Sequence, residues 1–189
     1  MDWLKNFLMN NGISGDDAEV ATYGIYRAML LAAGIMVALI LGRIFGSVKH
    51  TICFLVFFMP LRVFAGGYHA DSLWKCGILS SVIVILANLF LNITLHSYGE
   101  IMVAIVIITS VIHFYLVPQD NSAKRLFDWE KLRFKKISYC IICVYMILAL
   151  VSLRWNWYFM LQTICVVMIL SSFSLLVAYF LNRKMERKN

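Results

Sequence analysis

The chain has 189 residues, of which 62% are hydrophobic and 14% are charged, and its mean hydropathy is +0.81. A soluble domain of this length cannot bury so much apolar surface, so the composition excludes an ordinary soluble protein. The formal net charge of +7 would by itself suit a nucleic-acid-binding protein. In a membrane protein, however, basic residues gather beside anionic lipid on cytoplasmic loops. We therefore expect a single membrane-embedded domain over residues 1–189 that contacts membrane lipids and no nucleic acid.

The first twelve residues have the pattern of a helix that lies on a membrane surface. Trp3, Leu4, Phe7 and Leu8 recur at helical spacing among polar residues, which predicts a short amphipathic interfacial helix over 1–12. Ser14 and Asp17 then form a capping-box pattern, because a hydroxyl and a carboxylate at this spacing can each satisfy an end-of-helix N–H. We expect a helix to begin there and to continue into the first membrane span.

Six charge-free runs follow, and a straight span needs about 20 residues. The first run reaches that length when its capped approach and Ile44 and Phe45 are added, and the last four are long enough or nearly so. The second is short and contains Pro60, so it is either a tilted span or a re-entrant segment. The prediction is an all-α polytopic protein, with about six transmembrane or partly re-entrant helices over 15–182 and a basic tail over 183–189. The runs are 28–42, 50–61, 76–99, 101–119, 137–153 and 155–182.

Lysine and arginine counts in the short connections predict the orientation in the membrane. The 120–136 loop and the tail are strongly basic, whereas the connections near Glu100 and Arg154 are nearly free of positive charge. Loop and tail are therefore expected in the cytoplasm, and counting six spans back also puts residues 62–75 there. Arg43 and Lys49 oppose this assignment, since both would lie in an outer loop.

Residues 62–76 interrupt the apolar pattern with ionisable side chains that are costly at the edge of a bilayer unless they are solvated or used. One interpretation is an ordinary loop, in which Arg62 and Lys75 mark the cytoplasmic side and Cys76 starts the next span. The other is a catalytic pair, because a thiol becomes a strong nucleophile when a base such as His69 takes its proton.

Geometry limits the catalytic interpretation. In one straight helix, residues seven positions apart are separated by about 10.5 Å along the axis, too far for proton transfer, so the chain must bend between His69 and Cys76. Asp71 or Ser72 is a good N-cap for a helix that continues through Cys76, whose thiolate the helix dipole would then favour. The pair Gly66-Gly67 can adopt unusual backbone angles and present N–H groups to an oxyanion.

This stretch resembles the signature of the accessory gene regulator B (AgrB-type) family, the membrane cysteine endopeptidases of bacterial peptide quorum sensing. The resemblance covers nearly the whole chain, since Glu19 with Tyr23-Gly24 is similar to the family's N-terminal segment and Pro118 through Lys124-Arg125 to its basic loop. The residues that carry the central match are Arg62, Gly66-Gly67-Tyr68-His69-Ala70 and Cys76.

The resemblance implies that Cys76 is the nucleophile and His69 its general base in a peptidase of the bacterial cell membrane. The enzyme would cut an AgrD-like propeptide, hold it as a thioester and transfer it to an internal Cys or Ser, which closes a cyclic thiolactone or lactone. No cofactor or metal is implied, and a homodimer is typical of the family. The alternative is a non-catalytic membrane transport or sensor subunit whose loop cysteine is incidental.

Supporting roles are expected for several neighbours of this pair. Arg62 would clamp a carboxylate or the backbone, and Asp71 is interpreted as a helix cap in preference to a third member of the catalytic set. The basic stretch from Lys124 and Arg125 to Lys136 would face anionic lipid or the acidic tail of a propeptide.

Other reactive side chains are interpreted as structural. The five cysteines are odd in number and mostly lie in apolar runs, which argues against a disulfide framework. Cys140 and Cys143 have metal or redox spacing, but no second pair or nearby histidine accompanies them, so packing is the favoured interpretation. His96 and His113 are expected to be interface or core residues in preference to a proton relay.

Overall fold

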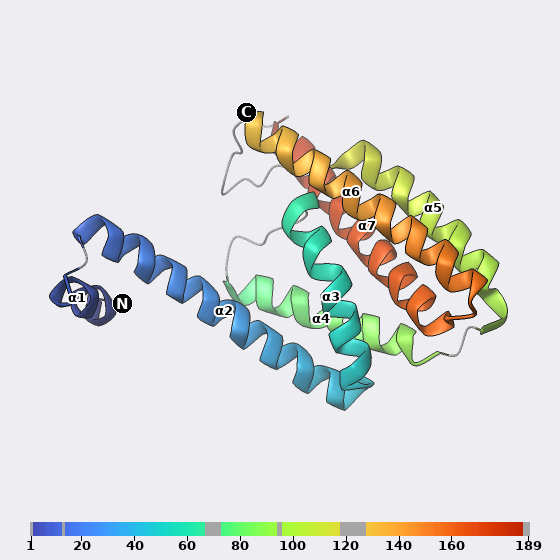
Figure 1. The fold of residues 1–189 in the computed structure, drawn as a ribbon, viewed down its shortest axis with the longest axis horizontal. Coiled ribbons are helices and arrows are strands. Elements are labelled where there is room, and N and C mark those ends of the chain that lie inside the picture. Colours follow the sequence, from blue (N-terminus) through green and yellow to red (C-terminus); the bar gives the residue numbers. More distant parts are fainter. Residues whose placement is uncertain (1, 13, 67–72, 94–95, 118–127, 187–189) are drawn as a thin grey trace.

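The computed structural model describes residues 2–12, 14–66, 73–93, 96–117 and 128–186, and it contains helices but no strand within those ranges. The residues within those ranges form seven α-helices and one short 3-10 helix, and Figure 1 shows how the α-helices are arranged. They are α1 (Asp2–Asn10), α2 (Gly15–Phe45), α3 (Val48–Ala65), α4 (Leu73–Leu91), η1 (His96–Tyr98), α5 (Gly99–Leu116), α6 (Asp128–Arg154) and α7 (Tyr158–Glu186).

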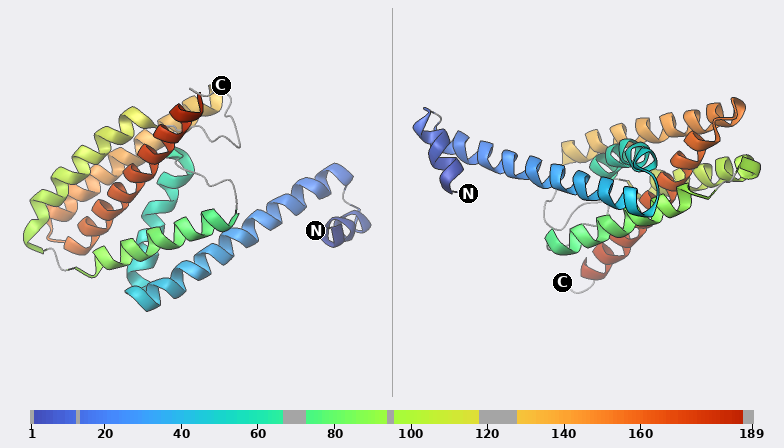
Figure 2. Two further views of the ribbon diagram at one scale, coloured as in Figure 1. Left: turned by 180° about the vertical axis from the view of Figure 1, so that it is seen from behind. Right: turned by 90° about the horizontal axis from the view of Figure 1, so that it is seen from below.

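Helix α7 forms the centre of the bundle. It packs against α3, α4, α5 and α6, and nearly all of its side chains from Leu161 to Leu175 are buried. Helix α2 packs on the α3 and α4 side of this bundle, and its first half leads away from the other helices together with α1 (Figures 1 and 2). The core therefore lies around α7, while α2 presents most of its apolar surface to the outside.

The helices α2 to α7 are each long and apolar enough to cross a membrane. This confirms the predicted all-α fold with six spans, and the chain is a multi-pass membrane protein. The doubtful second segment is a continuous 18-residue helix through Pro60, so its length and composition suit a full span.

Both helices predicted for the N-terminal region are present, and the location of the first on a membrane surface stays a prediction. Helix α1 is short and exposes Trp3 and Phe7, whose rings stack at 5.9 Å and form an apolar face suited to a membrane surface. Helix α2 starts directly after Ser14, whose hydroxyl oxygen accepts the Asp17 backbone N–H at 3.3 Å. The Asp17 carboxylate accepts from that same hydroxyl at 2.7 Å.

Three helix boundaries differ from the sequence-based prediction. The charge-free run 76–99 does not form one helix, because α4 ends at Leu91. The Gln162 amide of α7 donates hydrogen bonds to the carbonyl oxygens of Phe90 and Ile93 at this end, both at 2.7 Å. The basic 120–136 stretch is also not entirely a loop, since α6 begins at Asp128. Likewise, α7 continues to Glu186 and includes the start of the predicted tail.

A close contact between α2, α3 and α4 fixes the start of α3. The Thr51 hydroxyl donates to the Asn88 side-chain carbonyl at 3.1 Å, and both residues are fully buried. Gly42 and Gly46 face this pair so closely that a Cβ on Gly42 would overlap the Thr51 side chain, and one on Gly46 would lie 2.7 Å from Asn88 Oδ1. Only glycine at these two positions lets the helices approach to this distance.

Candidate active site at the end of helix α3

The candidate site lies where α3 ends and α4 begins. Arg62 is in the last turn of α3, and Gly66 follows the helix with a φ of +80°, a conformation that favours glycine. Cys76 is the fourth residue of α4, and its free thiol is half-buried. The two helix ends therefore bring Arg62, Gly66 and Cys76 to the same end of the bundle.

The Arg62 guanidinium is the best-anchored group of this site. Its Nη1 donates to the Ser174 hydroxyl oxygen of α7 at 2.9 Å and to the Gly66 carbonyl oxygen at 3.3 Å. The guanidinium also interacts electrostatically with the thiol of Cys76. Arg62 thus links the end of α3 to the central helix and places a positive charge close to the sulfur atom.

Several residues predicted for the site lie outside the described residues. They are Gly67, His69, Asp71 and Ser72 next to Cys76, together with Lys124 and Arg125 before α6. The pairing of His69 with Cys76, the helix cap and the propeptide contacts stay predictions. The described residues give the two attachment points of the 67–72 segment, which are Gly66 on α3 and Leu73 on α4.

The basic start of α6 lies at the same end of the bundle as the candidate site. Phe134 in this part of α6 packs edge-on against Phe64 near the end of α3, with ring centroids 5.8 Å apart. Three of its cations are exposed, namely Arg133, Lys135 and Lys136. A surface of positive charge therefore lies beside the helix end that carries Arg62.

His113 forms a separate polar cluster inside the bundle. The side chain is fully buried on α5, and its Nδ1 lies 2.8 Å from the Thr109 carbonyl oxygen. Because a carbonyl can only accept, Nδ1 must carry the proton, and Nε2 then accepts from the Ser171 hydroxyl of α7 at 3.0 Å. Both nitrogens are thus satisfied, as the interpretation of His113 as a core histidine requires.

The other cysteines differ in their exposure. Cys140 and Cys143 are exposed on α6 instead of packed inside, Cys53 is half-buried on α3, and Cys165 is buried in α7. Among the described residues, no three His, Cys, Asp or Glu side chains gather in a way that could hold a metal ion.

Sequence reasoning missed Ser174, although it is the partner that holds Arg62. The two residues are 112 positions apart, so no local pattern connects them. The available signal is a cluster of buried serines in one apolar helix, since Ser171, Ser172 and Ser174 would each need a hydrogen-bond partner there.

Comparisons with known proteins point to one family. The family model described as accessory gene regulator B matches residues 2–178. AgrB-like protein 2 of Clostridium perfringens (strain 13 / Type A) is 28% identical over 142 residues, and an AgrB-like protein of Clostridium perfringens (strain SM101 / Type A) is 27% identical over 142 residues. Each match covers 71% of this chain and 66% of the relative's length. No solved structure matches.

Proposed function

Since the chain belongs to the accessory gene regulator B family, we propose that it is a membrane-embedded cysteine endopeptidase and cyclase that processes an AgrD-like quorum-sensing propeptide. The observation that carries the proposal is the position of Arg62, which Ser174 and Gly66 hold at the end of α3 within electrostatic range of Cys76. Family membership supplies the class of substrate. This position supplies a fixed positive charge that can stabilise the negative charge developing in acyl transfer at the sulfur atom.

The proposed reaction has two acyl transfers. His69 takes the proton of Cys76, the thiolate attacks the scissile carbonyl, and the protonated His69 gives the proton to the departing amine. The N-terminal part of the propeptide is then a thioester of Cys76. An internal cysteine or serine of that part loses its proton to His69 and attacks the thioester, which releases the Cys76 thiolate and closes a thiolactone or lactone ring.

Arg62 has two roles in this proposal. Its guanidinium stabilises the negative charge that builds up when the thioester forms and breaks, because a preorganised cation acts strongly in a site shielded from water. Its bond to the Gly66 carbonyl oxygen also holds the backbone from which the 67–72 segment departs. A fixed position for that segment would keep the general base at a constant distance from the sulfur atom.

We assign the reaction to the cytoplasmic side of the membrane. The support is the basic start of α6, which lies at the same end of the bundle as Arg62, and cytoplasmic ends of membrane proteins are enriched in Lys and Arg. The same cations, with Lys124 and Arg125 before them, suit the acidic tail of a propeptide.

Co-expression with a candidate propeptide tests the proposal. We expect Cys76→Ala and His69→Ala to abolish cleavage, measured by mass spectrometry of the propeptide, because each removes a reacting group. Cys140→Ala is the matched control, since it deletes an exposed thiol on α6 and should leave cleavage unchanged. Normal cleavage by both active-site variants would disprove the enzyme and favour a non-catalytic transport or sensor subunit.

A further inference from the structure

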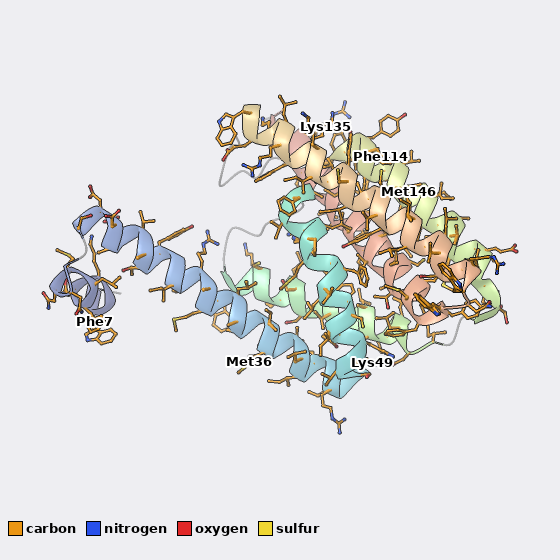
Figure 3. The ribbon with its side chains drawn as sticks, viewed as in Figure 1. Phe7, Met36, Lys49, Phe114, Lys135 and Met146 are labelled. Atoms are coloured by element: carbon orange, nitrogen blue, oxygen red, sulfur yellow. The ribbon has the colours of Figure 1, made fainter. Side chains whose placement is uncertain are left out.

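A pocket of about 620 Å³ lies at the end of the bundle opposite the candidate active site. His50 lines it at the start of α3, whereas Arg62 is near the other end of the same helix. Twelve residues of helix separate these two, which corresponds to about 18 Å along the axis. Figure 3 labels one residue at each of these two ends of the bundle, namely Lys49 at the start of α3 and Lys135 near the start of α6.

The walls of the pocket are held in place by side-chain amides. The Gln162 amide nitrogen binds the carbonyl oxygens of Phe90 and Ile93 at the end of α4, and the Asn92 amide nitrogen donates to the Phe45 carbonyl oxygen at 3.1 Å. These bonds connect α2, α4 and α7 around the cavity. The pocket is therefore preformed, and a ligand would not have to order its walls.

The polar groups at the pocket favour an anion. Nδ1 of His50 is buried and has no hydrogen-bond partner, and its ring packs on Phe159 with centroids 5.1 Å apart. The Lys49 ammonium lies 5.3 Å from the centre of the same Phe159 ring. Helix α7 begins at Tyr158 in the pocket wall, so the positive end of its dipole is also there. None of the described lining residues is Asp or Glu.

Part of the wall is apolar, since Leu91, Ile93 and Met160 line the cavity. Trp157 of the wall and its neighbour Trp155 are both exposed and stack at 6.0 Å, and tryptophans in such positions mark the headgroup level of a bilayer. A ligand with an anionic head and an apolar body matches both kinds of wall.

We propose that this pocket binds an anionic phospholipid of the leaflet opposite Cys76, with the phosphate at Lys49 and His50 and an acyl chain along Leu91 and Ile93. The site is separate from the proposed peptidase chemistry. A lipid bound there would connect the start of α3 with the start of α7, because His50 and Phe159 both line the pocket.

The test measures lipid binding to the full-length protein, delipidated in detergent, by native mass spectrometry with phosphatidylglycerol, phosphatidylcholine and soluble glycerol phosphate as probes. We expect phosphatidylglycerol to bind about fivefold more tightly than phosphatidylcholine, and Lys49→Gln to remove this preference, as expected for one cation near a charged headgroup. Ile93→Trp should block both lipids, since Ile93 is 51% exposed and a larger ring there fills the cavity without entering the core.

Arg43→Gln is the matched control. Neither Arg43 nor Lys49 lines the pocket itself, but Lys49 lies over the Phe159 ring of its wall, whereas no such contact is seen for Arg43 among the described residues. Arg43 is an exposed cation in the last turn of α2 at the same end of the bundle, so its loss should leave phosphatidylglycerol binding within about twofold. The proposal is overturned if Lys49→Gln and Ile93→Trp bind phosphatidylglycerol as the unmodified protein does, or if both lipids bind equally. Displacement of the lipid by an equal concentration of glycerol phosphate would also overturn it, because the site would then take a soluble phosphate.

Discussion

The two ends of α3 are fixed in different ways. At its start, Thr51 packs against Asn88 and Gly42 so closely that there is no space for one additional carbon atom. At its end, Arg62 is held through polar contacts with Ser174 and Gly66. At the start of α3, the volume of a new side chain therefore decides whether a substitution is tolerated. At its end, the charge and the hydrogen bonds of the side chain decide. Substitutions at the two ends should consequently separate stability from activity.

The largest effect is expected at Arg62. Replacing it with Ala should lower the rate of propeptide cleavage by about 10²–10³-fold, which is the usual cost of removing one preorganised electrostatic contact to a reacting group. Arg62→Lys should recover part of that rate because it restores the charge without the planar fork. Initial rates at saturating propeptide measure both variants.

The matched control for this prediction is Arg183→Ala. Arg183 is an exposed cation of α7 that contacts Tyr179, with the guanidinium carbon 6.0 Å from the ring centre. We expect Arg183→Ala to leave the cleavage rate unchanged. Equal losses of rate in the Arg62 and Arg183 variants would mean that the overall positive charge of the protein, and not the position of Arg62 near Cys76, supports the reaction.

The next largest effect concerns stability at the other end of the helix. Gly42→Ala should destabilise the bundle by about 1–3 kcal/mol, because the added Cβ overlaps the Thr51 side chain and the helices must separate. Thermal unfolding in detergent measures the change. The rate per folded molecule should stay close to that of the unmodified protein.

Gly34→Ala is the matched control, since a Cβ at this position of α2 meets no atom within 4 Å. If both substitutions lower the unfolding temperature equally, the loss comes from the helix itself and the close contact with Thr51 is not needed.

A smaller effect is expected from Ser174→Ala. The substitution removes one hydrogen bond to a charged group, worth about 1.5–3 kcal/mol at most, while Arg62 keeps its contact with Gly66. We expect the cleavage rate to fall about tenfold with little change in KM, since the bond positions Arg62 and does not touch the substrate. Ser174→Thr should restore the rate because it returns the hydroxyl.

Local features of the fold could be predicted from the sequence. The cap at Ser14 and the short amphipathic helix with Trp3 and Phe7 depend on residues three or four positions apart, and both are present. The end of α4 could not be predicted in this way. It depends on Gln162, which binds carbonyl oxygens about 70 positions earlier in the chain.

The candidate site shows the same limit. The motif around Cys76 is continuous in sequence, and its resemblance to a family signature is the basis for the thiol chemistry, which stays a prediction. The partner of Arg62 was not predictable, because Ser174 comes from a helix that reaches the site only after the bundle has packed. The density of charge also predicts the wrong boundary for α6. The basic stretch before residue 137 is predicted to be a loop, whereas the chain is helical from Asp128.

The central position of α7 has a consequence for the biogenesis of the protein. The helix is the last of the six spans to be synthesised, yet it supplies contacts for α3, α4, α5 and α6. Ser174 follows Arg62 by 112 residues, so at ordinary rates of translation Arg62 waits roughly 6–20 s for its partner. Arg62 therefore gains its anchor on α7 only long after the thiol of Cys76 has been synthesised.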